Sequence, residues 1–392
     1  MIYLDHHATT PADPLVVEAM MPWMTLNFGN PHSHTHIAGR DAAAACDDAL
    51  QSIAAQIGGH ADSLLVTSGA TESNNLAIQG LMLHPRQRRR HIITAASEHP
   101  SVIDPIARLG KEGFRVTLLP VRPQDDPRCG QIDLDLLRQA IDDDTALVSI
   151  MWANNEIGTI QPMAQIANIV HEAGALLHCD ATQAFGHLKI ELDQCDIDLL
   201  SASAHKCYGP KGVGLLALGK RRRIKLRPLF EGGGQQHGLR SGTLNVAGLM
   251  GMREAVRICN HRLALDNERQ RRLRDHLWRR IREAFPDTVI NGPPLDAAEA
   301  DPLGRLPNNL NLSFADVEGE TLMAASPDLA ISSGSACSSV DPRPSHVLMA
   351  IGLSESRARR SLRFGLGRGT TLAEIDDAVE MLIRGHAKVT SK

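Results

Sequence analysis

The sequence predicts an α/β protein, with a mostly parallel β-sheet in a large domain and a smaller α+β domain at the C-terminal end. Between residues 64 and 218, short apolar runs alternate with amphipathic segments of helical period. Such continuously apolar strands need cover on both faces, which the intervening helices can provide. From about residue 261 the composition shifts to a highly charged helix followed by interspersed strands and helices. We therefore predict an arm (residues 1–13), a large domain (14–260) and a small domain (261–392).

The overall composition favours an ordinary globular protein. The chain has 392 residues, of which 43% are hydrophobic and 22% charged, and this is enough for two domains with a core each. The net charge of −4 provides no strong field toward nucleic acid or an anionic membrane, so we expect neither as a partner. The basic runs Arg86–Arg90 and Lys220–Lys225 are interpreted as solvated loops.

Seven cysteines are scattered along the chain without a Cys-x-x-Cys pair. An odd, scattered set argues against a disulfide framework and against a zinc site, and it favours a reducing compartment. The sequence Met1–Asp5 leads directly into structured sequence and leaves no room for a signal peptide. No stretch approaches 18 uninterrupted apolar residues. A cytoplasmic enzyme without a bound metal is the prediction.

After the extended arm, the first predicted elements are two helices. Pro14–Met24 begins with proline in its first turn, and the alanine-rich segment Gly39–Ile57 has apolar residues at helical spacing. Between them lies a loop with three histidines at alternate positions, His32, His34 and His36. No carboxylate or cysteine joins them, so we do not predict a metal site there.

A predicted strand, Leu64–Thr67, leads through the turn Ser68–Gly69 into Ala70, Thr71 and a helix that continues to Leu83. A Gly/Ser turn before a helix is suited to bind phosphate, because the first N–H groups are free and the helix dipole is positive there. The same pattern also describes a simple helix cap, with Ser68 or Thr71 as the capping residue. Taken alone, the turn leaves both interpretations equally open.

Strands and helices then alternate regularly. The predicted strands are His91–Ala95, Arg115–Pro120, Ala146–Trp152 and Ala175–Asp180, and the helices between them are Ser101–Lys111, Leu134–Ile141 and Met163–Ala173. Ligands of such sheets bind beyond the carboxyl ends of the strands. His99, Asn155 and Asp180 all fall at such ends, which predicts a functional site at this edge.

A lysine follows the next predicted strand, which begins at Ile197–Leu200. Lys206 has Ser203 and His205 beside it and is closed off by a Gly/Pro turn before strand Gly212–Leu218. Such an amine can form a Schiff base with an aldehyde cofactor, whose phosphate the hydroxyl and imidazole could bind. A lone loop lysine is usually just solvated. Asp180 favours the cofactor interpretation, because a buried carboxylate needs a cation and a protonated pyridine nitrogen is one.

Two motifs carry a resemblance to a known family. Asp180-Ala181-Thr182-Gln183 and the segment Ser203–Gly212 resemble the cofactor signature of the class V aminotransferases, which depend on pyridoxal 5'-phosphate and have the type I fold. Within that family the sequence is most similar to cysteine desulfurases of the NifS/IscS kind. The resemblance runs from Tyr3 to Thr371, and beside Lys206 it favours the phosphate interpretation of the Ser68–Thr71 turn.

The resemblance implies a set of residues around the cofactor, which would be bound as a Schiff base on Lys206. The implied cofactor-binding residues are Ala70, Thr71, His99, Asn155, Asp180, Gln183, Ser203, His205, Lys206 and Thr243. In the family the histidine that matches His99 stacks on the ring and is a candidate proton carrier. Gln183 would bind the phenolic oxygen. The residue that matches Thr243, after the glycine-rich run 231–238, reaches the phosphate of the partner subunit in a homodimer.

The small domain is predicted to begin with a charged helix from about His261 to Phe285, followed by a Pro-, Asp- and Ala-rich loop. Its further predicted strands are Asn309–Phe314, Leu329–Ser332 and Ser361–Leu366, and its helices are Gly319–Ala325, Ser345–Ile351 and Leu372–Val389. Arg363 lies in one of these strands, where a fixed guanidinium could bind a carboxylate with two hydrogen bonds. In the family the matching arginine binds the substrate carboxylate, and Asn155 would assist it.

Cys337 lies within Ser332–Ser339, a run of small residues that predicts a mobile loop with an exposed thiol. A buried structural role is common for cysteine but fits this polar setting poorly. The run resembles the active-site loop Ser-Ser-Gly-Ser-Ala-Cys of the long-loop desulfurases. Catalysis would then rest on Cys337, Lys206 and His99, with Cys337 attacking as a thiolate.

The predicted function is therefore conversion of L-cysteine to L-alanine, with sulfur passed to Cys337 as a persulfide and then to an acceptor protein. That acceptor could be an iron–sulfur scaffold, since sulfur supply for iron–sulfur cluster assembly is one use of such enzymes. A C–S lyase or an aminotransferase on the same scaffold remains an alternative, and Cys337 distinguishes them. A non-catalytic scaffold would not need Lys206 and Asp180 together, and a nicotinamide site would need G-x-G-x-x-G. His6 and His7 replace the small or aromatic pair of most relatives, which predicts altered substrate access.

Overall fold

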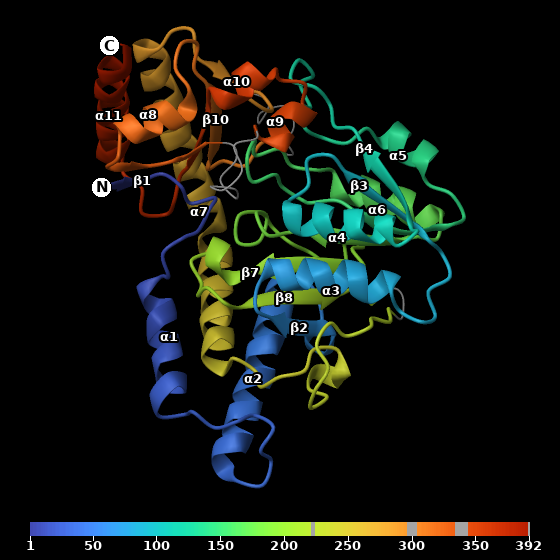
Figure 1. Ribbon diagram of the computed structural model, residues 1–392. Coiled ribbons are helices and arrows are strands. Elements are labelled where there is room, and N and C mark those ends of the chain that lie inside the picture. The colour runs from blue at the N-terminus through green and yellow to red at the C-terminus, as the bar shows by residue number, and fades with distance from the viewer. Residues whose placement is uncertain (221–223, 296–303, 334–343, 391–392) are drawn as a thin grey trace.

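A seven-stranded β-sheet organises the larger part of the molecule (Figure 1). The computed structural model describes residues 1–220, 224–295, 304–333 and 344–390. The sheet contains, in chain order, β2 (Leu64–Thr67), β3 (His91–Ala95), β4 (Arg115–Leu119), β5 (Thr145–Ser149), β6 (Leu176–Asp180), β7 (Leu199–Ser203) and β8 (Gly214–Leu218). Across the sheet the order is β2-β8-β7-β6-β5-β3-β4. β8 runs antiparallel to both neighbours, and the other pairs are parallel.

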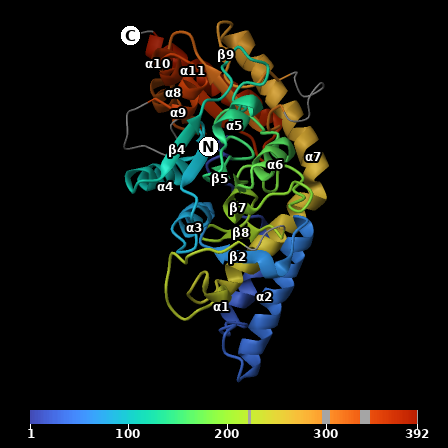
Figure 2. The ribbon, with the colours of Figure 1, turned by 90° about the vertical axis from the view of Figure 1, so that its right-hand side faces the viewer.

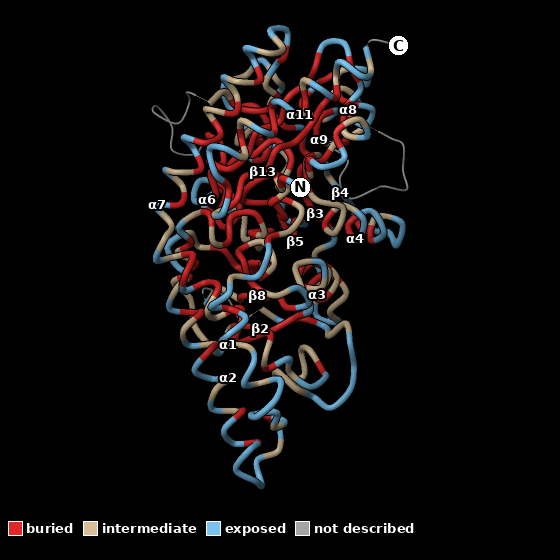
Figure 3. Tube along the Cα trace, turned by 90° about the vertical axis from the view of Figure 1, so that its left-hand side faces the viewer, coloured by how far each residue is buried: buried red, intermediate tan, exposed pale blue. Residues whose placement is uncertain are grey.

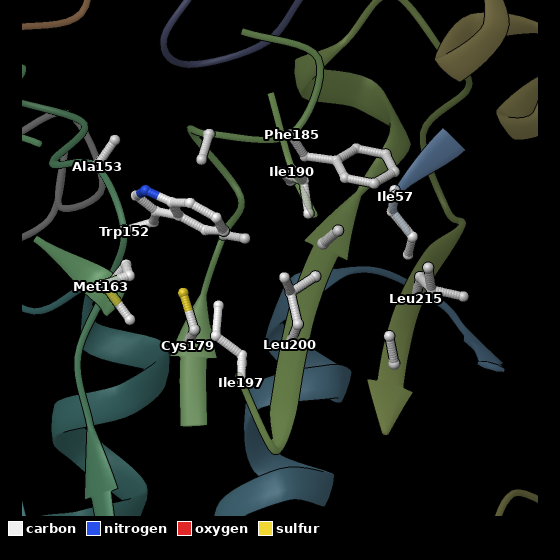
Figure 4. Close-up of a cluster of buried hydrophobic side chains, with 14 of the residues drawn as sticks. Ile57, Trp152, Ala153, Met163, Cys179, Phe185, Ile190, Ile197, Leu200 and Leu215 are labelled. Atoms are coloured by element: carbon white, nitrogen blue, oxygen red, sulfur yellow. The ribbon is translucent and has the colours of Figure 1, made fainter. Parts of the chain in front are cut away.

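Helices cover both faces of this sheet, as the apolar strands require. On one face α3 (Ala70–Met82) and α4 (Pro100–Lys111) form a buried cluster with Ile92, Leu147 and Leu199. On the other, α2 (Ile37–Gln56), α6 (Met163–Glu172) and the start of α7 cover the adjacent strand residues. Figure 4 shows part of that second cluster, in which Cys179, Leu200 and Leu215 project from neighbouring strands. The remaining helices of this part are α1 (Pro14–Thr25) and α5 (Leu134–Ala140).

The long helix α7 (Val246–Ala284) connects the two parts of the molecule (Figure 2). It begins well before the charged helix predicted from His261. The reason is that its first half is apolar and packs on the large core, so only the second half shows the charged composition. The predicted domain boundary at residue 260 therefore falls inside one helix, and we propose that each half of α7 belongs to a different domain.

The smaller part is built on an antiparallel sheet of order β12-β13-β10-β9. Its strands are β9 (Val289–Ile290), β10 (Asn309–Ser313), β12 (Ser332–Ser333) and β13 (Ser361–Gly365), and its helices are α8 (Gly319–Ala325), α9 (His346–Ala350), α10 (Glu355–Arg359) and α11 (Leu372–Thr390). Figure 3 shows buried segments in the interior of both parts. The predicted strand Leu329–Ser332 is two short strands, because β11 (Leu329–Ala330) pairs with the N-terminal β1 (Ile2–Tyr3) while β12 pairs with β13.

Candidate active site

A cavity of about 480 Å³ lies at the carboxyl edge of the large sheet. At this edge the strand order reverses between β3 and β5. The chain leaves β3 toward β4 on one side and leaves β5 toward β6 on the other. Ligands of α/β sheets commonly bind where the strand order reverses in this way. Among the described residues, every site residue predicted from the sequence except Thr243 lines it: Ala70, Thr71, His99, Asn155, Asp180, Gln183, Ser203, His205, Lys206 and Arg363. The polar side chains that the sequence places at the strand ends therefore line a single cavity.

Asp180 ends β6 and is buried at the floor of this cavity. Its carboxylate accepts hydrogen bonds from Asn74 Nδ2 at 2.8 Å and from the Thr182 backbone N–H at 2.9 Å. Both donors are neutral. A buried carboxylate held only by neutral donors in the described part of the chain is suited to pair with a cationic group of a ligand.

His99 caps the N-terminus of α4, and a short network fixes its ring. Asn74 Nδ2 donates to Ser101 Oγ (2.9 Å), which lies 2.8 Å from His99 Nδ1, and the Ser101 backbone N–H also donates to that nitrogen (3.1 Å). Because Nδ1 accepts these bonds, the proton of the neutral ring is assigned to Nε2. Burial lowers the pKa of His99, so the ring is neutral near pH 7.

Lys206 follows β7 in a short 3₁₀ turn, and its amine points to the N-terminal arm. Nζ donates to the backbone oxygens of His7 at 2.5 Å and Ala8 at 2.8 Å. The arm is held in place by Thr10, whose backbone N–H and hydroxyl both donate to the carbonyl of His205 (2.9 Å each). The arm is therefore a wall of the site, which the strand-end prediction did not include.

The N-terminus of α3 opens onto the cavity without a side-chain cap. Its N-cap residue Gly69 has φ +153°, and a Cβ at Gly214 would lie 2.5 Å from the Gly69 Cα, so only glycines allow this close approach. Ser203, His205 and Lys211 line the same region. Free backbone N–H groups, a hydroxyl and a lysine together favour an anion such as phosphate.

Two side chains near this helix terminus have shifted pKa values. Burial lowers the pKa of His205 to about 4, helped by the charge of Lys206, and the ring accepts or donates at Thr9 Oγ1 (3.1 Å). Glu72 lies in the first turn of α3. Burial opposes its ionisation, but hydrogen bonds from Arg240 and from the Ser68 N–H lower its pKa overall. Arg240 thereby balances the charge of the carboxylate in the first turn of α3.

Arg363 in β13 presents a buried guanidinium to the cavity. Nη2 donates to Asp5 Oδ1 (2.9 Å) and to Ser332 Oγ (3.1 Å), and Nη1 donates to the Asn155 carbonyl (3.2 Å). In the described residues Nε has no partner. These contacts hold the guanidinium in one orientation, which is what binding of a substrate carboxylate requires.

One predicted residue lies elsewhere, and a second is not among the described residues. Thr243 is exposed on the single chain and does not line the cavity. Cys337 lies outside the described residues. The segments flanking it are described: Ser332 contacts Arg363, and Ser345 Oγ donates to the buried Glu156, the neighbour of Asn155, at 2.5 Å.

Several cavity-lining residues were not predicted as site residues from the sequence: His7, Ala8, Thr9, Ser68, Gly69, Glu72, Ser101, Met151, Ala153, Thr182, Lys211 and Gly212. Most of these are neighbours of predicted residues, so extending each motif by a few positions would have found them. His7–Thr9 are different, because they come from a distant segment. The unusual His6-His7 pair was the available signal.

The residues present fit pyridoxal 5'-phosphate, the group implied by the resemblance. Asp180 suits the pyridine nitrogen, Lys206 the aldehyde, and the α3 N-terminus the phosphate. Within the described residues, buried polar atoms of this cavity also lack protein partners: His7 Nε2, Thr182 Oγ1 and Arg363 Nε. Buried polar atoms are normally hydrogen-bonded, so these three residues leave hydrogen-bonding capacity beside the cavity that no described protein group uses.

The described residues contain no group of three or more His, Cys, Asp or Glu suited to a metal ion. His36, one of the three loop histidines, caps α2 by accepting from the Gly39 N–H at 3.1 Å. Across the described ranges no helix is long and apolar enough to cross a membrane.

Comparisons with known proteins show the family and the fold of the chain. A model of the family described as aminotransferase class-V matches residues 2–377. A protein of Rickettsia bellii (strain OSU 85-389) called "Cysteine desulfurase IscS" is 46% identical over 381 residues, which cover 97% of this chain and 90% of that protein. A solved structure described as "NIFS-LIKE PROTEIN" superposes with a TM-score of 0.88 at 34% identity, covering 100% and 99% of the two chains. "SspA in complex with cysteine" gives 0.78 at 35% identity, covering 93% and 99%. These likenesses confirm the predicted fold class and the predicted family.

Proposed function

Because the chain belongs to the aminotransferase class-V family, we propose that it is a pyridoxal 5'-phosphate-dependent cysteine desulfurase. It would convert L-cysteine to L-alanine and transfer the sulfur to Cys337. One observation carries the choice of this reaction within the family: the segment with Cys337 is flanked by Ser332 at Arg363 and by Ser345 at Glu156, both next to the cavity. The relatives called cysteine desulfurase and the neighbour solved with cysteine support the same choice.

The cofactor, when bound, supplies an electron sink that accepts the electron pair of the substrate Cα–H bond. Lys206 would hold it covalently and Asp180 would keep its ring nitrogen protonated. Gln183 would donate to the phenolic oxygen. The phosphate would be bound by the N–H groups of Ala70 and Thr71, with Ser203, His205 and the Thr243 of a second copy.

Arg363 would bind the substrate carboxylate, with Asn155 beside it. Asp5 and Ser332 already hold the guanidinium on the Nη2 side, so little side-chain entropy remains to be lost when the carboxylate binds. With the carboxylate at Arg363, the substrate Cα would lie in the cavity that Lys206 also lines. A fixed α-carbon is needed before any proton can be removed from it.

Lys206 and His99 would carry protons. The amine of Lys206, which lines the cavity, would be the base that accepts the substrate Cα proton. His99 is neutral and held by Ser101, so it can accept a proton at one site and donate it at another.

The sulfur-transfer step requires Cys337 as a thiolate. Its sulfur attacks the substrate sulfur, a new S–S bond forms, and the substrate Cβ–S bond breaks with its electron pair remaining on carbon. Protonation of the carbon skeleton gives alanine. In total, L-cysteine and the enzyme thiol yield L-alanine and an enzyme persulfide, with no external oxidant or reductant.

A homodimer and a sulfur acceptor complete the proposal. Thr243 is exposed on the single chain, as expected for a residue that serves a second copy. Helix α1 and the segment after it also expose apolar side chains, including Met24, Leu26 and Phe28, which an interface between copies would cover. The acceptor would be a protein that takes the persulfide sulfur, such as an iron–sulfur scaffold, in the cytoplasm.

The deciding experiment is incubation with L-cysteine and measurement of alanine together with protein-bound persulfide. Wild-type protein should give both, and Cys337→Ala should lose alanine production while L-cysteine still changes the visible spectrum. Cys195→Ala, at a partly buried cysteine away from the cavity, is the matched control and should behave as wild type. If Cys337→Ala keeps wild-type turnover and releases pyruvate, ammonia and sulfide, the chain is a C–S lyase and the proposal is wrong.

A further inference from the structure

The side chain of His7 lines the cavity and has no role in the chemistry proposed above. It is 1% exposed. A Cβ at Gly365 would lie 2.8 Å from both its backbone nitrogen and its ring Cδ2, so the glycine of β13 makes room for this imidazole. A buried ring with a glycine packed against it is held in one place.

His7 and Gln183 bind each other twice. His7 Nδ1 lies 2.9 Å from Gln183 Oε1, and Gln183 Nε2 donates to the His7 carbonyl at 3.0 Å. The carbonyl accepts only, so it fixes which end of the carboxamide is nitrogen: a flipped amide would bring two oxygens together. Gln183 Oε1 therefore faces the imidazole, and because it too accepts only, His7 Nδ1 must carry the proton.

This assignment determines the other ring nitrogen. A neutral imidazole with its proton on Nδ1 has a lone pair on Nε2. Burial, reinforced by the charges of Arg363 and Lys206, lowers the pKa of His7 well below its ordinary value, so the ring is neutral near pH 7. In the described residues Nε2 has no hydrogen-bond partner. Nε2 is thus a buried acceptor on a residue that lines the cavity, and no described protein group satisfies it.

We propose that His7 is a positioning and specificity residue: Nδ1–H fixes the Gln183 amide as a donor to the cofactor's phenolic oxygen, and Nε2 accepts a hydrogen bond from the substrate thiol. This rests on the proposed function. The substrate carboxylate is assigned to Arg363 and its amine joins the cofactor, so the thiol S–H is the donor that remains. His7 would then favour amino acids with a donor group at the β-carbon.

Asparagine separates the two roles. Asn Nδ2 can occupy the place of His Nδ1, so His7→Asn keeps the donor to Gln183 and removes Nε2. His7→Ala removes both groups, and His7→Leu, which has the shape of asparagine without polar atoms, serves if the alanine variant does not fold. His6→Asn is the matched control, because the His6 ring contacts the Gly365 carbonyl (Nδ1 at 3.0 Å) and not Gln183.

The first readout is the pH titration of the visible band of the bound cofactor. A donor at the phenolic oxygen draws charge away from the proton on the imine nitrogen, so losing it raises that nitrogen's pKa. His7→Ala or His7→Leu should raise it by about one unit, as should Gln183→Ala, since hydrogen bonds to charged groups are of this strength. The double variant should match Gln183→Ala alone. His7→Asn and His6→Asn should titrate as wild type.

The second readout is ligand affinity in a Cys337→Ala background, where binding is seen without turnover. His7→Asn should weaken L-cysteine about three- to tenfold, the usual value of one hydrogen bond, and leave S-methyl-L-cysteine unchanged because it lacks the thiol donor. His6→Asn should change neither.

The inference is overturned if His7→Ala and His7→Leu titrate as wild type while Gln183→Ala shifts, or if His7→Asn weakens both ligands equally. A failure of the proposed function looks different. Wild-type protein would then form no persulfide from L-cysteine, whereas the titration shift and the ligand selectivity would still report on His7.

Discussion

Two walls of the cavity differ in how the chain builds them. The sheet wall, defined by Asp180, His99 and Lys206, follows the ends of β6, β3 and β7, and part of its bonding is local: Asp180 bonds Thr182 and His99 bonds Ser101, each two residues away. The arm wall, defined by His7, Ala8 and Arg363, depends on distant pairings. His7 and Gln183 are 176 positions apart, and Arg363 and Asp5 are 358 apart. Local motifs therefore place the residues of the sheet wall, although Lys206 also bonds the distant His7 and Ala8, whereas the arm wall forms only when the fold is complete.

The largest expected effect is at the centre of the sheet wall. Lys206→Ala should abolish covalent cofactor attachment and lower turnover by about 10⁴-fold, because both the anchor and a base are lost. Borohydride reduction followed by peptide mapping checks the attachment. Labelling of Lys211, which also lines the cavity, would show that the anchor is misassigned.

Asp180→Asn should have the second-largest effect. It should lower the rate of substrate Cα–H cleavage by about 10³-fold, the usual scale for losing one aligned electrostatic contact in an active site. The near-isosteric change removes the partner of the ring cation, so the measurement is exchange of the substrate Cα hydrogen for deuterium. Circular dichroism should show an intact fold. Undiminished exchange in the variant would refute the role of Asp180.

The arm wall is tested by Arg363→Lys. Lysine cannot reproduce the two-pronged contact, so the KM for L-cysteine should rise about 10- to 100-fold while the cofactor spectrum stays unchanged. Arg357→Lys is the control, because Arg357 bonds Asn291 and Ser313 and does not line the cavity. Equal losses in both variants would mean that the effect is structural.

The smallest expected effect concerns stability against pH. Burial lowers the pKa of His178, His187 and His205 to about 4, so between about pH 6.5 and 4 the unfolded chain binds protons that the folded chain does not. This contribution to the free energy of unfolding is complete above pH 6.5 and is lost as the pH falls. Urea denaturation at several pH values measures it.

Carboxyl groups also contribute to this pH dependence. Burial raises the pKa of Glu98, so its contribution to stability changes with pH in the direction opposite to that of the histidines. A histidine variant separates the two contributions. His187→Gln keeps a donor for the Lys206 carbonyl and should lose about one proton from the pH slope. An unchanged slope would mean that His187 is protonated in the folded state at low pH.

Much of the sheet wall could be predicted from the sequence because its signals are local. The alternation of apolar strands and amphipathic helices reflects periods of a few residues, and the polar groups at the strand ends follow from the same pattern. Asp180, His99 and Lys206 can therefore be identified as candidates from their positions in the sequence alone. The charged half of α7 was also predicted as a helix from the sequence. Its apolar half was not predicted, because only its packing on the large core distinguishes it from a loop.

The arm wall was decided by tertiary structure. Nothing near His7 in the sequence indicates Gln183, and the antiparallel direction of β8 or the pairing of β1 with β11 has no local signature. These contacts are chosen by burial of the whole chain, in which polar groups must find partners wherever the packed elements bring them together. The sequence by itself determined the fold class and which polar groups lie at the strand ends, while only the folded chain decided which distant residues line the same cavity.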